Sequence, residues 1–484
     1  MRLTWIALSL STILVYSCQV TQEFAGVDHT IEMEQFPIDE ITTDSSTLGD
    51  LSIDEFFKSR ELIDLINTGL ANNRNLGMAV KSIEIAQSYY LQGKAAYFPT
   101  LSVGPQLTYG VLSENSTGGS NGDRGYQGYQ LGVNSSWEID LWGKLNSQEK
   151  AAFADYQSAH AGLKTVQTQL IGQIASLYYQ LVALDARQEI TERTIDNWQT
   201  SVETIRALKE AGTPSVTEVA VQQNIAQMHF AQALLVDIQQ NIFLLENTLN
   251  TLLARPYQPI EREDWLSIEM PEYLEVGLPA QLLANRPDLR QLEYQIRSDF
   301  ELVNVAKTNF YPALRINAGA GFESVRIGDF LNPTSLFANI TGGLTQPILD
   351  RRQNKTQLEV SNLLYEQSIL QYEEAYLQAV QEVTDALIAA RSSDEKLVYQ
   401  ESQLEALDQA VEFSNELLNN GLANYLEVLR ARDQVFTTEL SQVDTRLRKF
   451  SSVVSLYKAL GGGWNPATLD AVRVDMEEES GDTQ

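Results

Sequence analysis

The sequence contains very little cysteine and histidine. Cys18 is the only cysteine among 484 residues, so no disulfide can form within one chain. Three histidines are present, but none lies in an HExxH motif and no histidine–cysteine cluster suits zinc. A P-loop for nucleotide phosphates is also missing. These absences argue against an enzyme and predict a protein that needs neither a metal nor a cofactor.

Positive charge and long apolar runs are scarce as well. The chain has 64 acidic but only 34 basic residues, which gives a net charge of −30. Such a surface repels nucleic acid, so we expect no nucleic-acid partner. After the N-terminal segment no stretch reaches 18 consecutive apolar residues, so no transmembrane helix is expected there. If the protein crosses a membrane, it must do so with strands.

The N-terminus has the pattern of a targeting signal. Arg2 precedes the apolar segment 3–16, which is too short to span a bilayer comfortably. The small residue Ser17 and then Cys18 follow, an arrangement similar to a bacterial lipobox. That similarity implies cleavage before Cys18, acylation of its thiol and attachment to a membrane surface. An ordinary secretory signal or an uncleaved anchor would also fit the pattern.

Residues 70–101 and 283–314 are similar to each other, which indicates an internal duplication. Each segment reads as a helix that ends at an aromatic pair followed by proline. The two junctions are Tyr97, Phe98 and Pro99, and Phe310, Tyr311 and Pro312. Because a residue before proline disfavours the helical conformation, we expect each helix to stop there. The aromatic residues fit either an interfacial belt at a membrane surface or an ordinary packed junction.

After each proline, apolar residues recur at every second position. Four such runs are present, near 101–111, 130–141, 314–323 and 335–349, and the last is the weakest. Runs of about ten residues with one apolar and one polar side suit a membrane barrel with a wet lumen, although a soluble hairpin has the same pattern. Four strands cannot close a barrel around water, so several chains would have to contribute.

The remaining segments predict helices of unusual length. Residues 143–211 contain no proline and predict a rod of about 100 Å, and residues 353 to about 419 repeat the pattern. Their apolar residues recur at steps of three or four, so the rods should coil around neighbours. Shorter helices are expected near 56–97, 215–254, 279–309 and 423–460. Gly212 and Gly421 fit C-caps with positive φ, and Pro214 fits the start of the next helix.

This organisation resembles the TolC-like outer-membrane efflux family, and specifically its lipoprotein branch. The resemblance covers about residues 55–462 and rests on the duplication, the aromatic–proline junctions, "SSWEIDLWGK" (135–144), "LANRPDLR" (283–290) and the glycine turns. It implies a mainly α fold with membrane β-structure: a trimeric 12-stranded outer-membrane barrel, four strands per chain, continuous with a long periplasmic α-helical barrel. It also implies a lipid-anchored homotrimer whose partners are a periplasmic adaptor, an inner-membrane pump and outer-membrane lipid.

The resemblance assigns candidate roles to the two helical turns. The tips that would contact the adaptor are Gly212, Thr213 and Ser215 in the first turn and Gly421, Leu422 and Ala423 in the second. Glu218 and Glu427 stand where relatives often have aspartates near the periplasmic mouth, which makes them candidate gate residues. Arg430 stands where some relatives have a second acid, and pairing with an acidic neighbour would let it latch the closed state. Ordinary surface charge on coiled helices is the alternative for Glu427 and Arg430.

The predicted organisation has six parts. Residues 1–17 form the signal peptide, 18–54 a lipidated arm, 55–254 and 279–462 the two repeats, 255–278 their linker and 463–484 an acidic tail. The predicted function is the outer-membrane channel of a tripartite system that exports small molecules such as drugs. A duct for type I protein secretion is an alternative, and a soluble periplasmic coiled-coil scaffold is another, from a different class.

Overall fold

The computed structural model describes residues 20–26, 51–113, 125–213, 216–269, 285–420, 422 and 425–463. The chain divides into two compact units. The first contains Met1–Thr30, Ser82–His160 and Gln291–Tyr372, and the second contains Ile31–Lys81, Ala161–Arg290 and Glu373–Gln484. Each unit takes segments from both sequence repeats, and the predicted repeat boundaries remain predictions.

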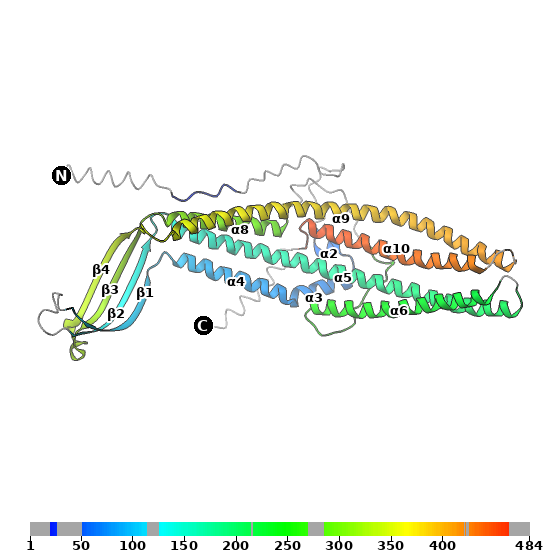
Figure 1. Cartoon of the computed structure of the whole chain (residues 1–484), viewed down its shortest axis with the longest axis horizontal. Helices are drawn as coiled ribbons and strands as arrows, with labels where there is room; N and C mark the ends of the chain where they lie inside the picture. Colours follow the sequence, from blue (N-terminus) through cyan, green and yellow to red (C-terminus); the bar gives the residue numbers. More distant parts are fainter. Residues whose placement is uncertain are drawn as a thin grey trace. The chain divides into compact units, whose positions relative to one another are not determined.

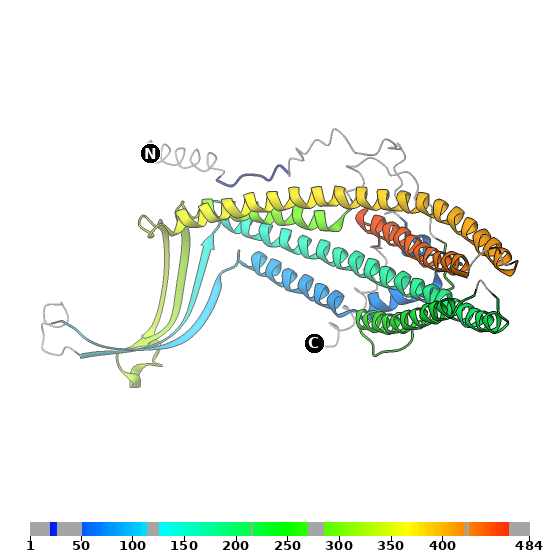
Figure 2. The same ribbon diagram turned by 45° about the vertical axis from the view of Figure 1, so that its right-hand side comes forward.

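Two long helices match the expected rods. α5 spans Lys144–Glu210 and α9 spans Gln353–Asn419, and each has 67 residues, or a length of about 100 Å. The 35-residue helices α6 (Glu218–Leu252) and α10 (Tyr425–Ala459) follow them as return helices. Within the second unit, α6 lies beside α5 and α10 lies beside α9 (Figure 2).

Aspartates stabilise the starts of both long helices. Asp140 accepts a hydrogen bond from the backbone N–H of Asn146 at 3.0 Å, and Asp350 accepts one from Asn354 at 2.9 Å. Each carboxylate satisfies a backbone N–H that has no partner inside the helix and complements the positive end of the helix dipole. The duplication therefore extends to the way in which each rod begins.

The helix expected over 56–97 is not continuous, so that prediction was wrong in detail. Three helices replace it: α2 (Ile53–Phe56), α3 (Arg60–Asn72) and α4 (Arg74–Ala95). Asn73 makes the second break, because its side chain accepts from the N–H of Leu76 at 3.1 Å and donates to the carbonyl of Leu252 at 2.8 Å. The helix expected over 279–309 is α8 (Pro287–Thr308), and residues 279–284 lie outside the described residues.

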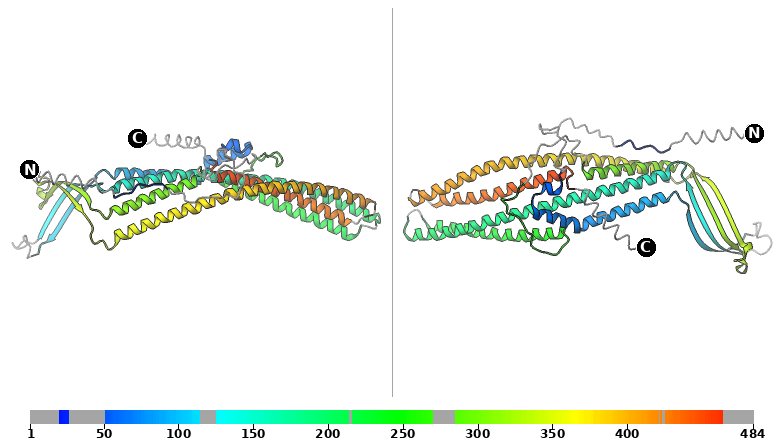
Figure 3. Two further views of the ribbon diagram at one scale, coloured as in Figure 1. Left: turned by 90° about the horizontal axis from the view of Figure 1, so that it is seen from above. Right: turned by 180° about the vertical axis from the view of Figure 1, so that it is seen from behind.

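The four expected strands form one antiparallel sheet in the first unit, with the order β1-β2-β3-β4. β1 spans Thr100–Val111, β2 Gly125–Ile139, β3 Ala313–Ser324 and β4 Leu336–Thr345. The strands lie side by side in Figure 1 and in both views of Figure 3. β2 of the first repeat pairs with β3 of the second, in a register that sets Trp137 opposite Ile316. In the part of the chain that the structure describes, β1 and β4 form the two edges of the sheet, and the outer side of each has no strand partner.

Aromatic side chains pair the helices of the first unit. Tyr90 of α4 contacts Phe153 of α5 with ring centroids 5.1 Å apart, and Phe300 of α8 contacts Tyr365 of α9 at 5.7 Å. Such pairs add about 0.5–1.5 kcal/mol beyond the burial of their surface. They hold each short helix against a long one beside the sheet.

The largest core lies in the second unit, where α3, α5, α10 and the connecting segment 255–269 meet. Phe56 stacks on Tyr457 with ring centroids 4.0 Å apart. Trp265 of the connecting segment packs edge-on against Phe450 of α10 at 5.3 Å. Because burial of such side chains removes a large apolar area from water, this core fixes the connecting segment onto the helices.

Candidate functional site

The sheet has one apolar and one polar face. Large side chains of the apolar face are well exposed in the single chain: Leu101 73%, Val103 68%, Leu107 69%, Tyr109 77%, Leu336 61%, Ile340 81% and Leu344 64%. A soluble antiparallel sheet would pack this face on a core. Exposed apolar patches of this kind mark contact with lipid or with another protein. The opposite face carries mostly hydroxyl and amide side chains and glycines, together with Glu138 and Arg315 near the helical end of the sheet.

The two aromatic–proline junctions differ in their packing. At the first, Phe98 is 73% exposed, while Tyr97 is half-buried and Pro99 exposed. At the second, Phe310 is 44% and Tyr311 39% exposed, and Pro312 is half-buried. The Tyr311 ring also contacts Trp142 with centroids 5.2 Å apart. A position at the membrane surface remains a prediction for all six residues.

The first helical turn has the predicted glycine cap. Gly212 has a φ of 78°, its N–H donates to the carbonyl of Lys209 at 3.0 Å, and the N–H of Thr213 donates to Leu208 at 3.1 Å. This pair of bonds is the Schellman motif, which satisfies the last carbonyls of a helix. Ser215, also predicted to lie at this tip, is outside the described residues.

Glu218 is held in a local network at the start of α6. Lys209 of α5 forms an ion pair with its carboxylate, and the Gln222 side chain donates to the carboxylate at 2.8 Å. The hydrogen bond from Lys209 is the main cause that lowers the pKa of Glu218 below its ordinary value. Lys209 was not among the residues predicted from the sequence, although a lysine in the last turn before a glycine cap is a recognisable signal.

The second turn shares part of this geometry. The N–H of Leu422 donates to the carbonyl of Leu417 at 2.9 Å, the counterpart of the bond that Thr213 makes. Gly421 and Ala423 lie outside the described residues. Glu427 and Arg430 are both exposed in the first turns of α10, and neither forms an ion pair within the described chain. Their roles at a gate therefore stay predictions.

A buried polar group joins the two helical hairpins near these turns. The Tyr425 hydroxyl of α10 donates to the Asn224 side-chain oxygen of α6 at 2.7 Å and lies 2.6 Å from the Ser201 hydroxyl of α5. Ser201 also donates to the same Asn224 oxygen at 3.0 Å. Apolar side chains surround the group: Trp198, Ile205, Val216, Ala220, Val221, Leu418, Val428 and Leu429. This buried polar group was not predicted from the sequence, because it forms only where three helices meet.

The "LANRPDLR" segment has a structural role in the second unit. Arg286 is 7% exposed and binds Asp288 with two hydrogen bonds, of 3.0 and 2.7 Å. It also donates to Glu382 of α9 at 2.8 Å and to the carbonyl of Ala459 in α10 at 3.1 Å. One arginine thus ties the start of α8 to two other helices.

Cys18 lies outside the described residues, but the segment that follows it is placed on α8. The Asn304 side chain accepts from the backbone N–H of Gln22 at 3.1 Å and donates to its carbonyl at 2.9 Å. Phe24 contacts Phe300 with ring centroids 5.4 Å apart. An arm that starts near Cys18 therefore docks on the first unit through its backbone.

Among the described residues, no helix is both long enough and apolar enough to cross a membrane. The same residues contain no group of three or more histidine, cysteine, aspartate or glutamate side chains that could hold a metal ion.

A family comparison shows where the chain belongs. The sequence model for outer membrane efflux proteins matches residues 65–255 and 278–462, which is most of the chain. The chain belongs to the outer membrane efflux protein family. Its membership confirms the predicted family and places this efflux protein in the outer membrane, whereas the lipoprotein branch stays a prediction.

Named relatives cover nearly the whole efflux protein. The solvent efflux pump outer membrane protein SrpC of Pseudomonas putida is 28% identical over 415 residues, 85% of this chain and 87% of the relative. The cation efflux system protein CusC of Escherichia coli is 26% identical over 415 residues, 84% of this chain and 87% of the relative.

Solved structures share the fold. The open state of the MtrE outer membrane channel of Neisseria gonorrhoeae has a TM-score of 0.80 at 23% identity, covering 92% of this chain and 98% of that one. The outer membrane protein VceC of Vibrio cholerae has a TM-score of 0.76 at 24% identity, covering 84% and 98%. These likenesses confirm the predicted fold class of long helices combined with strands.

Proposed function

We propose that three copies of this efflux protein form a passive duct through which small molecules leave the cell. The duct spans the outer membrane as a 12-stranded barrel, four strands from each copy, and continues into the periplasm as a helical barrel. The protein carries out no chemistry of its own. The names of its relatives mention solvents and cations, which favours small molecules as the exported class.

The sheet carries this proposal. It has an exposed apolar face, a polar face and two free edges, β1 and β4, in the described chain. Inside a bilayer every backbone N–H and C=O must find a partner, so open edges do not occur facing lipid. Pairing β4 of one copy with β1 of the next satisfies both edges. Three copies then close a ring with the apolar face toward lipid and the polar face toward water.

The energy for export comes from partners in this proposal. A periplasmic adaptor contacts the tips at Gly212, Thr213 and Ser215 and at Gly421, Leu422 and Ala423, and it links the duct to an inner-membrane pump. In support, both turns follow long helices, and Leu422 of the second turn is 76% exposed in the single chain. An exposed leucine at a helix tip is a suitable contact for another protein.

Gating takes place at the same end of the helices. Glu218, Glu427 and Arg430 are the charged gate residues, and the pairing of Glu218 with Lys209 supports a closed arrangement of the first turn. Glu427 and Arg430 have room to meet charges on neighbouring copies, since both are exposed. Docking of the adaptor separates the hairpins and widens the mouth.

Lipidation of Cys18 anchors the duct from the periplasmic side. The docked segment 20–26 supports this, because Gln22 is fixed on α8 only four residues after Cys18. Four extended residues span about 14 Å, so the acyl chains stay near the first unit. The membrane-interface junctions at Tyr97, Phe98 and Pro99 and at Phe310, Tyr311 and Pro312 belong to that same unit.

Single-channel recording in planar bilayers tests the duct and its gate. We expect detergent-purified trimers to give discrete openings, and Glu427→Ala to change their size or frequency. Glu412→Ala removes an exposed carboxylate of α9 and is the matched control. If Glu427→Ala behaves like Glu412→Ala, the gate lies elsewhere. A chain that stays soluble and never inserts would instead support a periplasmic scaffold.

A further inference from the structure

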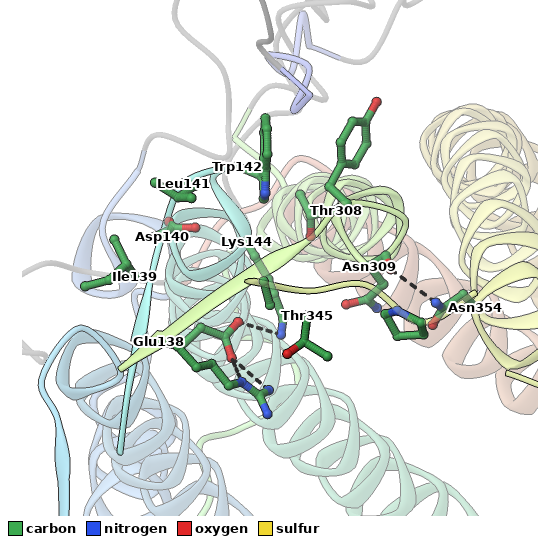
Figure 4. Close-up of a pocket in the computed structure, with 14 residues that line it drawn as sticks. Glu138, Ile139, Asp140, Leu141, Trp142, Lys144, Thr308, Asn309, Thr345 and Asn354 are labelled. Atoms are coloured by element: carbon green, nitrogen blue, oxygen red, sulfur yellow. Dashed lines mark hydrogen bonds and ion pairs between the residues drawn. The ribbon is translucent and has the colours of Figure 1, made fainter. Parts of the chain in front are cut away.

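Three charged side chains meet where the sheet joins the helices of the first unit. Glu138, near the end of β2, accepts from the Lys144 ammonium at 3.0 Å (Figure 4). Its other oxygen accepts two hydrogen bonds from the Arg315 guanidinium, at 3.0 and 3.2 Å. Glu138 and Arg315 are register partners on neighbouring strands, and Lys144 is the first residue of α5. We call these three residues the collar.

The collar carries a net positive charge. One carboxylate faces two cations, which leaves one positive charge per chain and three in a trimer. The side chain of Glu138 is only 21% exposed, whereas that of Arg315 is 56% exposed. The half-buried carboxylate is therefore neutralised by its partners, and the guanidinium presents its charge to the water on the polar face.

The rest of the polar face is almost free of charge. Beyond the collar, the next registered rows contain only hydroxyls, amides, glycines and one phenylalanine: Thr100, Ser136, Asn317 and Thr341, then Ser102, Asn134, Gly319 and Asn339, then Gly104, Gly132, Gly321 and Phe337. The other charged residue of the described strands is Glu323, at the far end of β3. No other charge on the described strands therefore lies close to the collar. The nearby carboxylate of Asp140, just after β2 in the same pocket, accepts the backbone N–H of Asn146 at the start of α5 and is not paired with Lys144 or Arg315.

A local charge of this kind acts differently from the net charge of the chain. The total of −30 is spread over the whole surface, and charges farther away than about 10 Å are screened at 0.1 M salt. Inside a narrow pore with low-dielectric walls, nearby charges dominate the potential. Charged residues within a membrane segment are also expected to face water rather than lipid.

We propose that the collar of Glu138, Lys144 and Arg315 is a specificity-determining ring that favours anions, and anionic groups on cargo, at the base of the barrel. This inference rests on the proposed duct, because the polar face lines a path only if the sheet closes into a barrel. The collar opposes the cation preference that the acidic composition alone would suggest.

The reactivity of a cysteine beside the collar tests this inference without requiring the periplasmic gate to open. Ser136→Cys places a thiol on the exposed polar face, two residues from Glu138. Membrane-inserted trimers are treated with anionic and with cationic methanethiosulfonate reagents, and the two rates are compared. The parent chain, in which Cys18 is the only cysteine, is treated in the same way to measure any reaction at that residue. We expect Arg315→Gln to lower the anionic-to-cationic rate ratio roughly fivefold and Glu138→Gln to raise it by a similar factor.

Lys58→Gln is the matched control. Lys58 is 55% exposed at its side chain and also pairs with a glutamate, Glu269, but it belongs to the second unit. It should leave the ratio unchanged. A ratio that neither Arg315→Gln nor Glu138→Gln moves beyond this control would overturn the collar while keeping the duct. If Ser136→Cys in inserted trimers reacts with neither reagent, the polar face is not wet, and the duct itself is overturned.

Discussion

The indole nitrogen of Trp142 donates a hydrogen bond of 2.8 Å to the carbonyl oxygen of Pro312. The indole of Trp137 makes a matching bond of 2.8 Å to the carbonyl of Tyr97. The two tryptophans stand five positions apart in "SSWEIDLWGK", yet they bind the aromatic–proline junctions of both repeats. This segment therefore works as a brace that holds both helix-to-strand transitions in one unit.

Trp142→Phe should weaken this brace. Phenylalanine keeps most of the ring packing against Tyr311 but cannot donate to Pro312, so we expect a loss of about 1 kcal/mol in the stability of the unit. The urea midpoint of the detergent-solubilised protein measures the loss. Trp137→Phe should show a similar loss through the other junction, and unchanged midpoints in both variants would show that the two bonds contribute nothing.

Gly321→Ala should disrupt the sheet, whereas Gly342→Ala should not. A Cβ at Gly321 would lie 2.1 Å from the carbonyl oxygen of Leu131 on β2, and the obstacle is backbone that cannot rotate away. A Cβ at Gly342 on β4 would meet nothing within 4 Å. We expect the first variant to lose folded trimer on gels and the second to retain it. Equal trimer yields would contradict the close approach of β2 and β3.

Acid should loosen the first turn through Glu218. Its pKa is lowered chiefly by the hydrogen bond from Lys209, so the ion pair stabilises the folded turn above the ordinary glutamate pKa of about 4.3. That contribution disappears as the pH falls through the lower pKa of the folded state. We expect Lys209→Met to reduce hydrogen-exchange protection of residues 208–213 at pH 7. The difference from wild type should shrink as the pH falls below the ordinary glutamate pKa and vanish once Glu218 is protonated in the folded state, and a difference that persists in acid would exclude this pair as its cause.

The bounds of the long helices could be predicted, because their limits are written in local sequence. The expected range 353–419 agrees with α9, and Gly212 has the positive φ that a glycine cap requires. The break at Asn73 also had a local signal, since asparagine is a strong N-cap residue. The sequence nevertheless predicted a continuous helix, because the apolar pattern continues through Asn73. Its second bond, to Leu252, could not be foreseen from local sequence.

Contacts between distant segments could not be read from the sequence. Arg286 was part of a recognised motif, but its bonds to Glu382 and Ala459 depend on how three helices pack. Arg351 and Arg352 both have positive φ in the turn before α9, where glycine would be the expected residue. The alternation of apolar and polar residues predicted the strands. The pairing of Glu138 with Arg315 could not be predicted, because it depends on the register between β2 and β3.

Tyr425→Phe should favour the open state of the duct. The change removes one hydroxyl, which bonds α10 to Asn224 and Ser201, and leaves the bond between those two residues in place. We expect the contact between the hairpins to weaken by about 1 kcal/mol, which corresponds to a roughly fivefold rise in the ratio of open to closed time. Single-channel recordings at neutral pH measure that ratio.

Tyr257→Phe provides the control for this prediction. The Tyr257 hydroxyl also donates to a buried side chain, Glu246 at 2.9 Å, but it belongs to the connecting segment and not to the cluster near the turns. Glu246 keeps its bonds to Arg262 and to the N–H of Ile260, so the local fold should survive. An increase in open time for Tyr425→Phe alone would identify the buried polar group as a closing contact between hairpins. An equal increase in both variants would instead indicate general loosening of the second unit, and no increase in either would mean that the hairpins separate without breaking this contact.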